Sequence, residues 1–383
     1  MVQHSASLTP RSSGGLFIGV MSGTSMDGAD AVLARFEPGR PPEHLAAASV
    51  AFPPTLRDAL MALNTPDADE LHRAATASTQ LAQIYAKVIE AVLLGAHTSR
   101  EDIIAVGVHG QTVRHRPEIG YTIQLNAPAL LAELSGIAVV SDFRSRDVAA
   151  GGHGAPLVPA FHAGIFSGDD ARIIVNLGGI ANITALAPDH PVTGFDTGPA
   201  NVLMDIWCAR HLGQSYDAAG AWAATGKVDT ILLDSLIDSE PWLRVPPPKS
   251  TGRDLFNASW LDQRLADFAS RHPARTLRAQ DVQATLSAFT ARTIAHAILA
   301  WTPKPQSVWA AGGGAHNDRL LHDLQSALGV PVAKTDALGV PAQHVEAYAF
   351  AWLAYAHCAG LPGNLPAVTG AKGLRILGSY TPA

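Results

Sequence analysis

The hydrophobic positions of the chain fall into short apolar runs and into longer stretches with helical spacing. Runs of strand length occupy residues 17–21, 102–108, 137–141, 173–175 and 307–311. Apolar residues at intervals of three and four occupy residues 67–94 and 279–300, and residues 346–359 are almost wholly apolar. Short runs are typical of buried strands, and the three- and four-residue spacing is typical of helices with one buried face. The pattern therefore predicts an α/β protein.

A polar turn, residues 22–28 (SGTSMDG), separates two apolar runs near the start of the chain. Apolar residues enter at Phe17–Met21 and leave with alternating spacing at residues 29–36, which predicts a β-hairpin. The turn supplies glycines, hydroxyls and carboxylates from Ser22, Gly23, Thr24, Ser25, Asp27, Gly28 and Asp30. Backbone N–H groups and hydroxyls converging on a turn form a nest for phosphate, and a carboxylate beside it suits Mg²⁺. Exposed hairpin tips have a similar composition, so these residues alone leave both interpretations open.

Residues 172–186 (RIIVNLGGIANITAL) repeat this organisation in the second half of the chain. The apolar run Ile173–Val175 enters a turn, and the run Ile183–Leu186 leaves it. The turn contains Asn176, Gly178, Gly179 and Asn182. Two hairpins of one kind suggest an internal duplication. Their turns would then hold a polyphosphate from both sides.

A third glycine-rich segment follows the strand predicted for residues 307–311. Gly312, Gly313 and Gly314 come before a helix predicted for residues 318–328. The lack of side chains would allow an adenine or a ribose to lie against the backbone. Close packing of the helix is the alternative explanation.

The acidic residue Asp196 lies within residues 194–205 (GFDTGPANVLMD), just ahead of a predicted helix. An acid in this position often caps the helix, and that interpretation stays open beside a role in a site. Residues 109–112 (HGQT) follow a predicted strand, where open α/β sheets bind ligands, so His109, Gln111 and Thr112 are candidates. Local bonding is the alternative for His109. Arg114 faces either solvent or a ligand anion.

A long glycine-rich loop occupies residues 150–156 (AGGHGAP). It follows a dense group of charged residues, which favours a cleft lining or a hinge. A flexible linker has the same composition and is the alternative.

Composition restricts the class of function. The 383 residues are 47% hydrophobic and 16% charged, which suffices for two domains with large cores. The net charge of −6 argues against a nucleic-acid or anionic-membrane partner. The two cysteines lack metal-ligand spacing and indicate a reducing compartment. The sixteen histidines include no HExxH-type pair, so the histidine pattern does not predict a resident metal site. The chain contains neither a Lys-bearing P-loop nor a GxGxxG after a predicted strand, so a nucleotide would need another architecture.

The order of these elements resembles the actin, hexokinase and Hsp70-type ATPase superfamily. The closer resemblance is to the anhydro-N-acetylmuramic acid kinases, through GVMSGTSMDGAD, VGVHGQT, NLGGIANIT, GFDTGPAN, AAGGGAHN and EAYAFAWLA. It extends from Phe17 to Tyr380 and leaves residues 1–15 as a polar extension. It implies a two-lobed α/β fold of duplicated mixed-sheet domains with a nucleotide cleft between them. Residues 1–14 would be a flexible tail, residues 15–150 with about 350–383 lobe I, and residues 151–349 lobe II.

The resemblance also implies an activity. Family members use ATP and water to convert 1,6-anhydro-N-acetylmuramate into N-acetylmuramate 6-phosphate, in the cytoplasm, during recycling of cell-wall sugars. ATP and Mg²⁺ are the expected cofactors. The expected partners are small molecules, not nucleic acid or membrane, and a homodimer is left open.

Carried onto this sequence, the resemblance makes Asp196 the base that activates water. The residues expected to bind ATP are Gly23, Thr24, Ser25, Met26, Asp27, Gly28, Ala29, Asp30, Gly178, Gly179, Asn182, Gly312, Gly313 and Gly314. The residues expected to contact the substrate are Thr112, Arg144 and Glu346. A helix-dipole role is the alternative for Glu346.

Two other functions remain to be weighed. A conventional amino-sugar kinase on the same fold would use Asp196 to deprotonate a free sugar hydroxyl. A nucleotide-dependent binding module, as actin and Hsp70 relatives are, would lack sugar turnover, but the sequence holds no peptide-binding domain or filament insertion.

Overall fold

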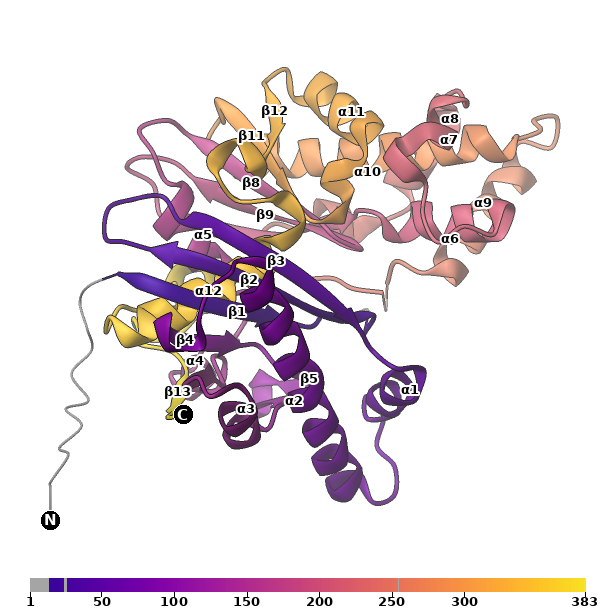
Figure 1. The fold of residues 1–383 in the computed structure, drawn as a ribbon. Coiled ribbons are helices and arrows are strands. Elements are labelled where there is room, and N and C mark those ends of the chain that lie inside the picture. The colour runs from indigo at the N-terminus through magenta and orange to yellow at the C-terminus, as the bar shows by residue number, and fades with distance from the viewer. Residues whose placement is uncertain (1–13, 24–25, 254) are drawn as a thin grey trace, which may run out of the picture. The chain divides into compact units, whose positions relative to one another are not determined.

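The computed structural model describes residues 14–23, 26–253 and 255–383 (Figure 1). The chain divides into two compact units. Unit 1 takes in the chain to Phe161 together with His344–Ala383, and unit 2 is His162–Gln343. The sequence suggested boundaries near residues 150 and 350. Glu346, which the sequence placed with the second lobe, therefore belongs to unit 1.

Unit 1 is built on a six-stranded mixed sheet in the order β13-β7-β4-β1-β2-β3. The strands are β1 (Gly15–Met21), β2 (Gly28–Phe36), β3 (Glu43–Ala51), β4 (Ile103–Val108), β7 (Val139–Ser141) and β13 (Ser379–Thr381). β1, β2 and β3 form an antiparallel meander, and β4 and β7 continue the sheet in parallel from β1. The predicted first hairpin is β1–β2, with Met21 opposite Asp30 at its end.

Helices cover both faces of this sheet because successive strand residues point to opposite sides. Ile18 and Val20 share a core with α2 (Glu70–Gly95). The intervening Gly19 faces α12 (Val345–Cys358), where an added Cβ would lie 1.9 Å from the Ala347 carbonyl oxygen. Gly107 on β4 meets the Phe350 carbonyl oxygen in the same way, at 2.0 Å. The two glycines allow the apolar α12 to lie directly on the strands (Figure 1).

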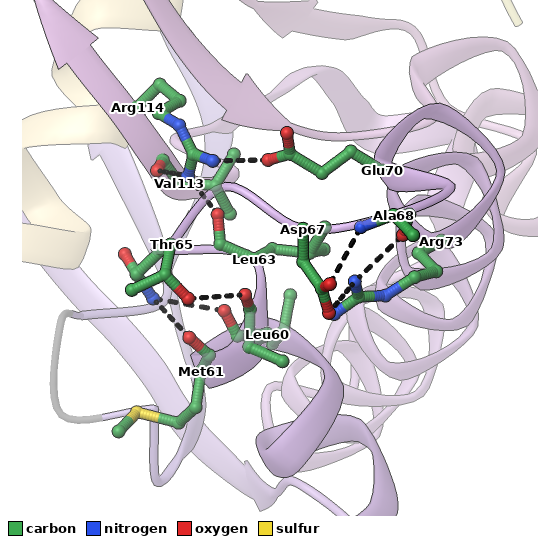
Figure 2. A network of polar contacts seen from close by, with 12 residues as sticks. Leu60, Met61, Leu63, Thr65, Asp67, Ala68, Glu70, Arg73, Val113 and Arg114 are labelled. Carbon is green, nitrogen blue, oxygen red and sulfur yellow. Dashed lines mark hydrogen bonds and ion pairs between the residues drawn. The ribbon is translucent and has the colours of Figure 1, made fainter.

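A separate two-stranded ribbon, β5 (Gln111–Arg116) with β6 (Tyr121–Leu125), follows β4. Arg114 on β5 donates to the Leu63 carbonyl and pairs with Glu70 at the start of α2 (Figure 2). Asp67 lies nearby in the same network and accepts bonds from the Ala68 N–H at 2.8 Å and from Arg73 at 3.0 Å. Arg114 is thus a structural residue that ties the ribbon to the loop before α2.

The remaining helices of unit 1 are short. They are α1 (Pro54–Ala62), α3 (Pro128–Ser135), α4 (Ser145–Ala149) and α13 (Pro366–Thr369). The boundary between the units lies within α5 (Val158–Phe166).

Unit 2 repeats the sheet of unit 1. Its strands follow the order β10-β9-β8-β11-β12, namely β8 (Arg172–Leu177), β9 (Ile180–Leu186), β10 (Thr193–Pro199), β11 (Ser307–Ala311) and β12 (Val332–Lys334). Again three strands form an antiparallel meander, and two more continue in parallel from its first strand. The shared order and directions support the internal duplication that the two hairpins suggested.

The helices of unit 2 pack around α10 (Ala279–Trp301), most of whose residues are buried. They are α6 (Val202–Leu212), α7 (Ala221–Ala224), α8 (Thr230–Asp238), α9 (Ala258–Arg271) and α11 (Asp318–Leu328). Within the described ranges, no helix combines the length and the apolar character needed to cross a membrane.

Candidate active site

The turn of the first hairpin is held by backbone and side-chain bonds. Met26 has a positive φ of 56°, and its N–H donates to the Gly23 carbonyl at 3.1 Å. The buried Gln111 donates to the same carbonyl from Nε2 at 3.2 Å. Thr24 and Ser25 lie outside the described residues. The turn is thus tied to the start of β5, and Gln111 and Thr112 lie in that strand rather than in the expected loop.

Three side chains in and next to this turn face the core instead of a ligand. The Ser22 hydroxyl bonds the Tyr85 hydroxyl at 2.7 Å and donates to the Gly110 carbonyl at 3.2 Å. Met26 and Ala29 are buried in the core of unit 1. The expectation that Ser22 offers its hydroxyl to phosphate is therefore wrong, and Met26 and Ala29 could meet a nucleotide only through their backbone.

A cavity of about 380 Å³ lies beside the turn. Its lining includes Gly23, Asp27, Gly28, Asp30, Ser49 and Glu346. Asp30 accepts a hydrogen bond from Ser49, and the exposed Asp27 pairs with Arg57 at 3.7 Å. Glu346 reaches this cavity from the first turn of α12. The fold therefore brings three carboxylates and the first glycine turn to one place.

His109 and Arg144 form a second polar centre in unit 1. Arg144 donates to His109 Nε2 from Nη2 at 2.8 Å and from Nε at 3.2 Å. Burial, and then the charge of Arg144, lower the pKa of His109 to about 3, so the imidazole is neutral and accepts through Nε2. Burial lowers the pKa of Arg144 to about 10, against the opposing effects of Glu346 and Asp147. His109 thus bonds a neighbouring protein group, which is the alternative to a ligand contact that the sequence left open.

The glycine-rich loop after α4 is anchored rather than loose. The fully buried Asp147 accepts from the Gly154 N–H at 2.8 Å, from Asn364 Nδ2 at 2.7 Å and from Thr369 Oγ1 at 2.8 Å. Arg144 donates to the Gly154 carbonyl at 2.7 Å. These bonds contradict the flexible-linker interpretation. Thr112 is also engaged, since it accepts from Gln124 at 3.2 Å.

Asp196 lies on β10 in unit 2, at an irregularity of the pairing between Asp196 and Gly198. Its Oδ2 accepts from the Ser250 hydroxyl and from the Thr251 N–H, each at 2.9 Å. Oδ1 accepts no hydrogen bond within the described ranges. Asn201, not Asp196, is the residue at the start of α6, so the helix-cap interpretation is wrong.

Burial raises the pKa of Asp196, and the bonds from Thr251 and Ser250, followed by the charge of Lys249, act in the opposite direction. Burial lowers the pKa of Lys249, with Asp196 opposing. The Lys249 ammonium donates to the Leu243 carbonyl at 3.1 Å and lies 4.4 Å from the centre of the Trp242 ring. Asp196 is therefore a partly desolvated carboxylate with one oxygen fixed by donors.

The second hairpin turn is fixed by the start of α6. The Gly178 carbonyl accepts from the Asn201 N–H at 3.0 Å, and the Gly179 carbonyl accepts from Ala200 and Val202 at 2.9 and 3.1 Å. Asn182 on β9 is paired with Asp196 on β10 and with Asn176 on β8. These residues are aligned across the three strands, which gives the sheet a row of polar residues next to the turn.

The third glycine segment packs against the second hairpin. A Cβ on Gly312 would lie 2.6 Å from Asn176 Oδ1, and one on Gly314 would lie 2.7 Å from Leu177 Cβ. Close packing therefore explains Gly312 and Gly314. Gly313 is exposed, and a Cβ there would meet nothing within 4 Å. Only Gly313 leaves open space for a flat group.

Sequence reasoning missed several polar residues of these centres. Ser49, Asp147, Ser250 and Thr251 carry no local signal that predicts these contacts. Ser250 and Thr251 follow a proline run, residues 246–248, that was interpreted only as a break between elements. Nothing in the local sequence links this run to Asp196, because the pairing is made by tertiary structure.

The two units repeat one mixed α/β sheet, and they carry the glycine turns and the partly buried carboxylate that the sequence led us to expect of a kinase. The family model for anhydro-N-acetylmuramic acid kinase matches residues 15–383. The chain belongs to the anhydro-N-acetylmuramic acid kinase family and is a kinase.

Curated relatives agree with the family match. The chain is 59% identical over 370 residues to the anhydro-N-acetylmuramic acid kinase of Bordetella petrii, with 97% of each chain covered. It is 56% identical over 375 residues to the protein of that name from Burkholderia orbicola, with 96% of each covered.

Two solved structures show a more distant similarity. The activator of 2-hydroxyisocaproyl-CoA dehydratase from Clostridium difficile, with bound ADPNP, has a TM-score of 0.45 at 13% identity, covering 91% of this chain and 96% of that one. A ROK family glucokinase from Streptomyces griseus, in complex with glucose and AMPPNP, has a TM-score of 0.37 at 16% identity, covering 88% and 99%.

Proposed function

We propose that the protein uses ATP and water to convert 1,6-anhydro-N-acetylmuramate into N-acetylmuramate 6-phosphate, with Asp196 as the base. The family membership supports the reaction. The observation that carries the role of Asp196 is its fixed carboxylate, with two donors on Oδ2 and none on Oδ1 among the described residues.

The anhydro sugar has no free 6-hydroxyl, because that oxygen bridges to the anomeric carbon. Water attacks the anomeric carbon, and the bond from this carbon to the bridging oxygen breaks. The bridging oxygen remains on the sugar and attacks the γ-phosphorus, whose bond to the β–γ bridging oxygen breaks to release ADP. Asp196 accepts the proton of water. In an inverting glycosidase an acid would protonate the leaving oxygen, and here phosphorus takes the place of that proton.

The surroundings of Asp196 suit a base. A base works best when its pKa approaches the working pH, and burial raises the pKa of Asp196 toward that range. The bonds from Ser250 and Thr251 orient the carboxylate and leave Oδ1 for a water molecule. Positioning of this kind is a major part of catalysis.

We propose ATP contacts for the glycine turns of each unit separately. In unit 1 we assign its phosphates to the backbone from Gly23 to Asp30, with Thr24 and Ser25 retained as predictions. In unit 2 we assign contacts to Gly178, Gly179 and Asn182, and the adenosine to Gly312, Gly313 and Gly314. Turns whose N–H groups converge attract phosphate oxygens, and the open space at Gly313 supports a flat group there.

Mg²⁺ would be held in unit 1. Carboxylate and hydroxyl oxygens from Asp27, Asp30 and Ser49 line one cavity, and such hard donors suit Mg²⁺. Within the described ranges, no group of three or more acidic, histidine or cysteine side chains is spaced to hold a metal by itself. The ion would therefore be shared with phosphate and water, and when bound it neutralises charge on the phosphates.

The sugar contacts would come from the same unit. Glu346 lines the cavity beside the first turn, which supports a contact to sugar or water. Arg144 and Thr112 already bond protein groups, so we propose for them a contribution to the shape of the sugar site. We assign the reaction to the cytoplasm, where ATP is supplied and the two free cysteines remain reduced.

Reaction in ¹⁸O-labelled water tests this function. The product should carry the label on the anomeric hydroxyl and unlabelled oxygen at the phosphate ester. A conventional amino-sugar kinase would instead phosphorylate free N-acetylmuramate and leave the anhydro sugar intact. Label-free sugar, or turnover of the free sugar alone, would reject the coupled reaction.

A further inference from the structure

An arginine lies beside the second glycine turn. A Cβ added to Gly179 would lie 3.7 Å from Arg253 Nη2 and 3.8 Å from Nε. The charged end of Arg253 therefore lies against the backbone of this turn. Arg253 is exposed, and its guanidinium makes no hydrogen bond or ion pair with any part of the chain that the structure describes. An unpaired guanidinium at a glycine turn is a ready site for an anion.

The backbone of the turn favours the same ligand. Its Gly178 and Gly179 carbonyls accept from the N–H groups of residues 200–202, which fixes the orientation of the peptide planes. The N–H groups of Gly178 and Gly179 donate to no acceptor in residues 14–23, 26–253 or 255–383. Free N–H groups next to a free guanidinium provide both donors and positive charge for a phosphate.

A carboxylate on the helix next to the turn interacts with the charge of the arginine. Asp205 lies on α6, the helix whose first residues hold the turn, and its charge interacts with that of Arg253. The Asp205 side chain is partly buried and no ion pair within 4.0 Å joins it to Arg253. Asp205 can thus orient the guanidinium without occupying its hydrogen-bond donors.

We propose that Arg253 is a phosphate ligand of the second turn, where it binds phosphate oxygens of ATP together with the N–H groups of Gly178 and Gly179. Asp205 acts as its positioning residue. This inference rests on the proposed function, because it takes ATP as the anion that the turn receives. A planar guanidinium matches phosphate geometry in two-bond contacts, and it stabilises the charge of the transferring group.

The position of Arg253 in the chain has a further consequence. Ser250 and Thr251, which bind Asp196, precede Arg253 in the same loop. A contact between phosphate and Arg253 would therefore stabilise the segment that orients the base. Nucleotide binding and water activation would then be coupled through one loop of unit 2.

Arg253→Gln and Arg253→Lys test the proposal. Titration with ATP in the absence of sugar should show that Arg253→Gln binds ATP at least roughly tenfold more weakly than the wild type, because one charged contact is lost. Arg253→Lys keeps the positive charge and should therefore lose less of the ATP affinity. Binding of adenosine, which has no phosphate, should be unchanged. The kcat should fall by roughly 10³, the lower end of the scale known for arginines that act on transferring phosphoryl groups. Asp205→Asn should weaken ATP affinity by a smaller factor than Arg253→Gln and leave the KM for the sugar unchanged.

Arg271→Gln is the matched control, because it removes an exposed arginine of unit 2 that bonds only the carbonyl of Asp267 in its own helix. Thermal melting checks that all variants fold. Arg253→Gln with ATP affinity and kcat equal to the control would overturn the inference, as would equal losses for adenosine and ATP. Absence of ¹⁸O incorporation by the wild type would instead overturn the proposed reaction, while the ATP titration would still decide the role of Arg253.

Discussion

Ser250 donates its hydroxyl to Asp196 Oδ2 at 2.9 Å, across a separation of 54 residues. The neighbouring Thr251 N–H donates to the same oxygen. A loop that follows a proline run thus fixes the orientation of a carboxylate on β10. This relationship supports Asp196 as a base more directly than its sequence motif does.

Replacement of Asp196 by Asn should remove turnover. The amide keeps the shape but cannot accept a proton, and loss of a general base typically costs roughly 10²–10⁴ in rate. Steady-state kinetics with the anhydro sugar would measure the loss, and titration would show ATP affinity close to wild type. Asp238→Asn, at an exposed acid paired with Arg244, serves as control. Near-normal rates in Asp196→Asn would exclude Asp196 as the base.

Activity should decline toward acid pH as Asp196 is protonated. Because burial raises its pKa, this decline should occur above the ordinary value of 3.8. The Ser250 bond lowers the pKa of Asp196, so Ser250→Ala should raise it and move the acid limb of kcat to higher pH. A pH–rate profile measures the shift. Ser239→Ala, where the hydroxyl bonds only a helix carbonyl, should leave the limb in place. A limb that stays unmoved in Ser250→Ala would contradict this account.

Replacement of Gly19 by Ala should destabilise unit 1. The new methyl would lie 1.9 Å from the Ala347 carbonyl oxygen of α12, so the helix must move away from the sheet. Overpacking of this kind typically costs about 1–3 kcal/mol in the free energy of unfolding. Urea denaturation measures it. Gly95→Ala, at the end of α2 with only Ala46 Cβ at 3.9 Å, should be neutral or stabilising. Equal stability of the two variants would show that the packing of α12 does not require its close approach to β1 at Gly19.

Asp147→Ala should loosen the glycine-rich loop at residues 150–156. The change leaves the Gly154 N–H without an acceptor, and it leaves Asn364 and Thr369 with only their weaker bonds to the Gly373 and Leu365 carbonyls. A donor left unpaired in the interior costs roughly 1–3 kcal/mol, so a loss of at least this size is expected in the free energy of unfolding. Limited proteolysis should show new cleavage within the loop. Asp267→Ala, at an exposed position, is the control. A protected loop in Asp147→Ala would mean that other contacts hold it.

Local patterns in the sequence were sufficient to predict many of the helices and strands. The hairpins β1–β2 and β8–β9, the long helices α2 and α10 and the strand–glycine–helix segment were all expected, and α11 begins and ends at the predicted residues. β3, α1, α5, α8 and α9 were not identified from the sequence. β3 is half-exposed at the edge of its sheet and rich in alanine, so its apolar alternation is weak.

The sequence by itself determined the family and the two glycine turns, and it singled out Asp196 as the proposed base, because these features reside in contiguous motifs. The tertiary structure decided which way the side chains of those motifs face. Ser22 and Met26 belong to a motif with a binding signature, yet both are buried in the core of unit 1. Likewise Ser250 reaches Asp196, and Glu346 reaches the first turn, only because the chain folds back on itself. Such pairings depend on the packing of whole elements, which no local spacing of residues records.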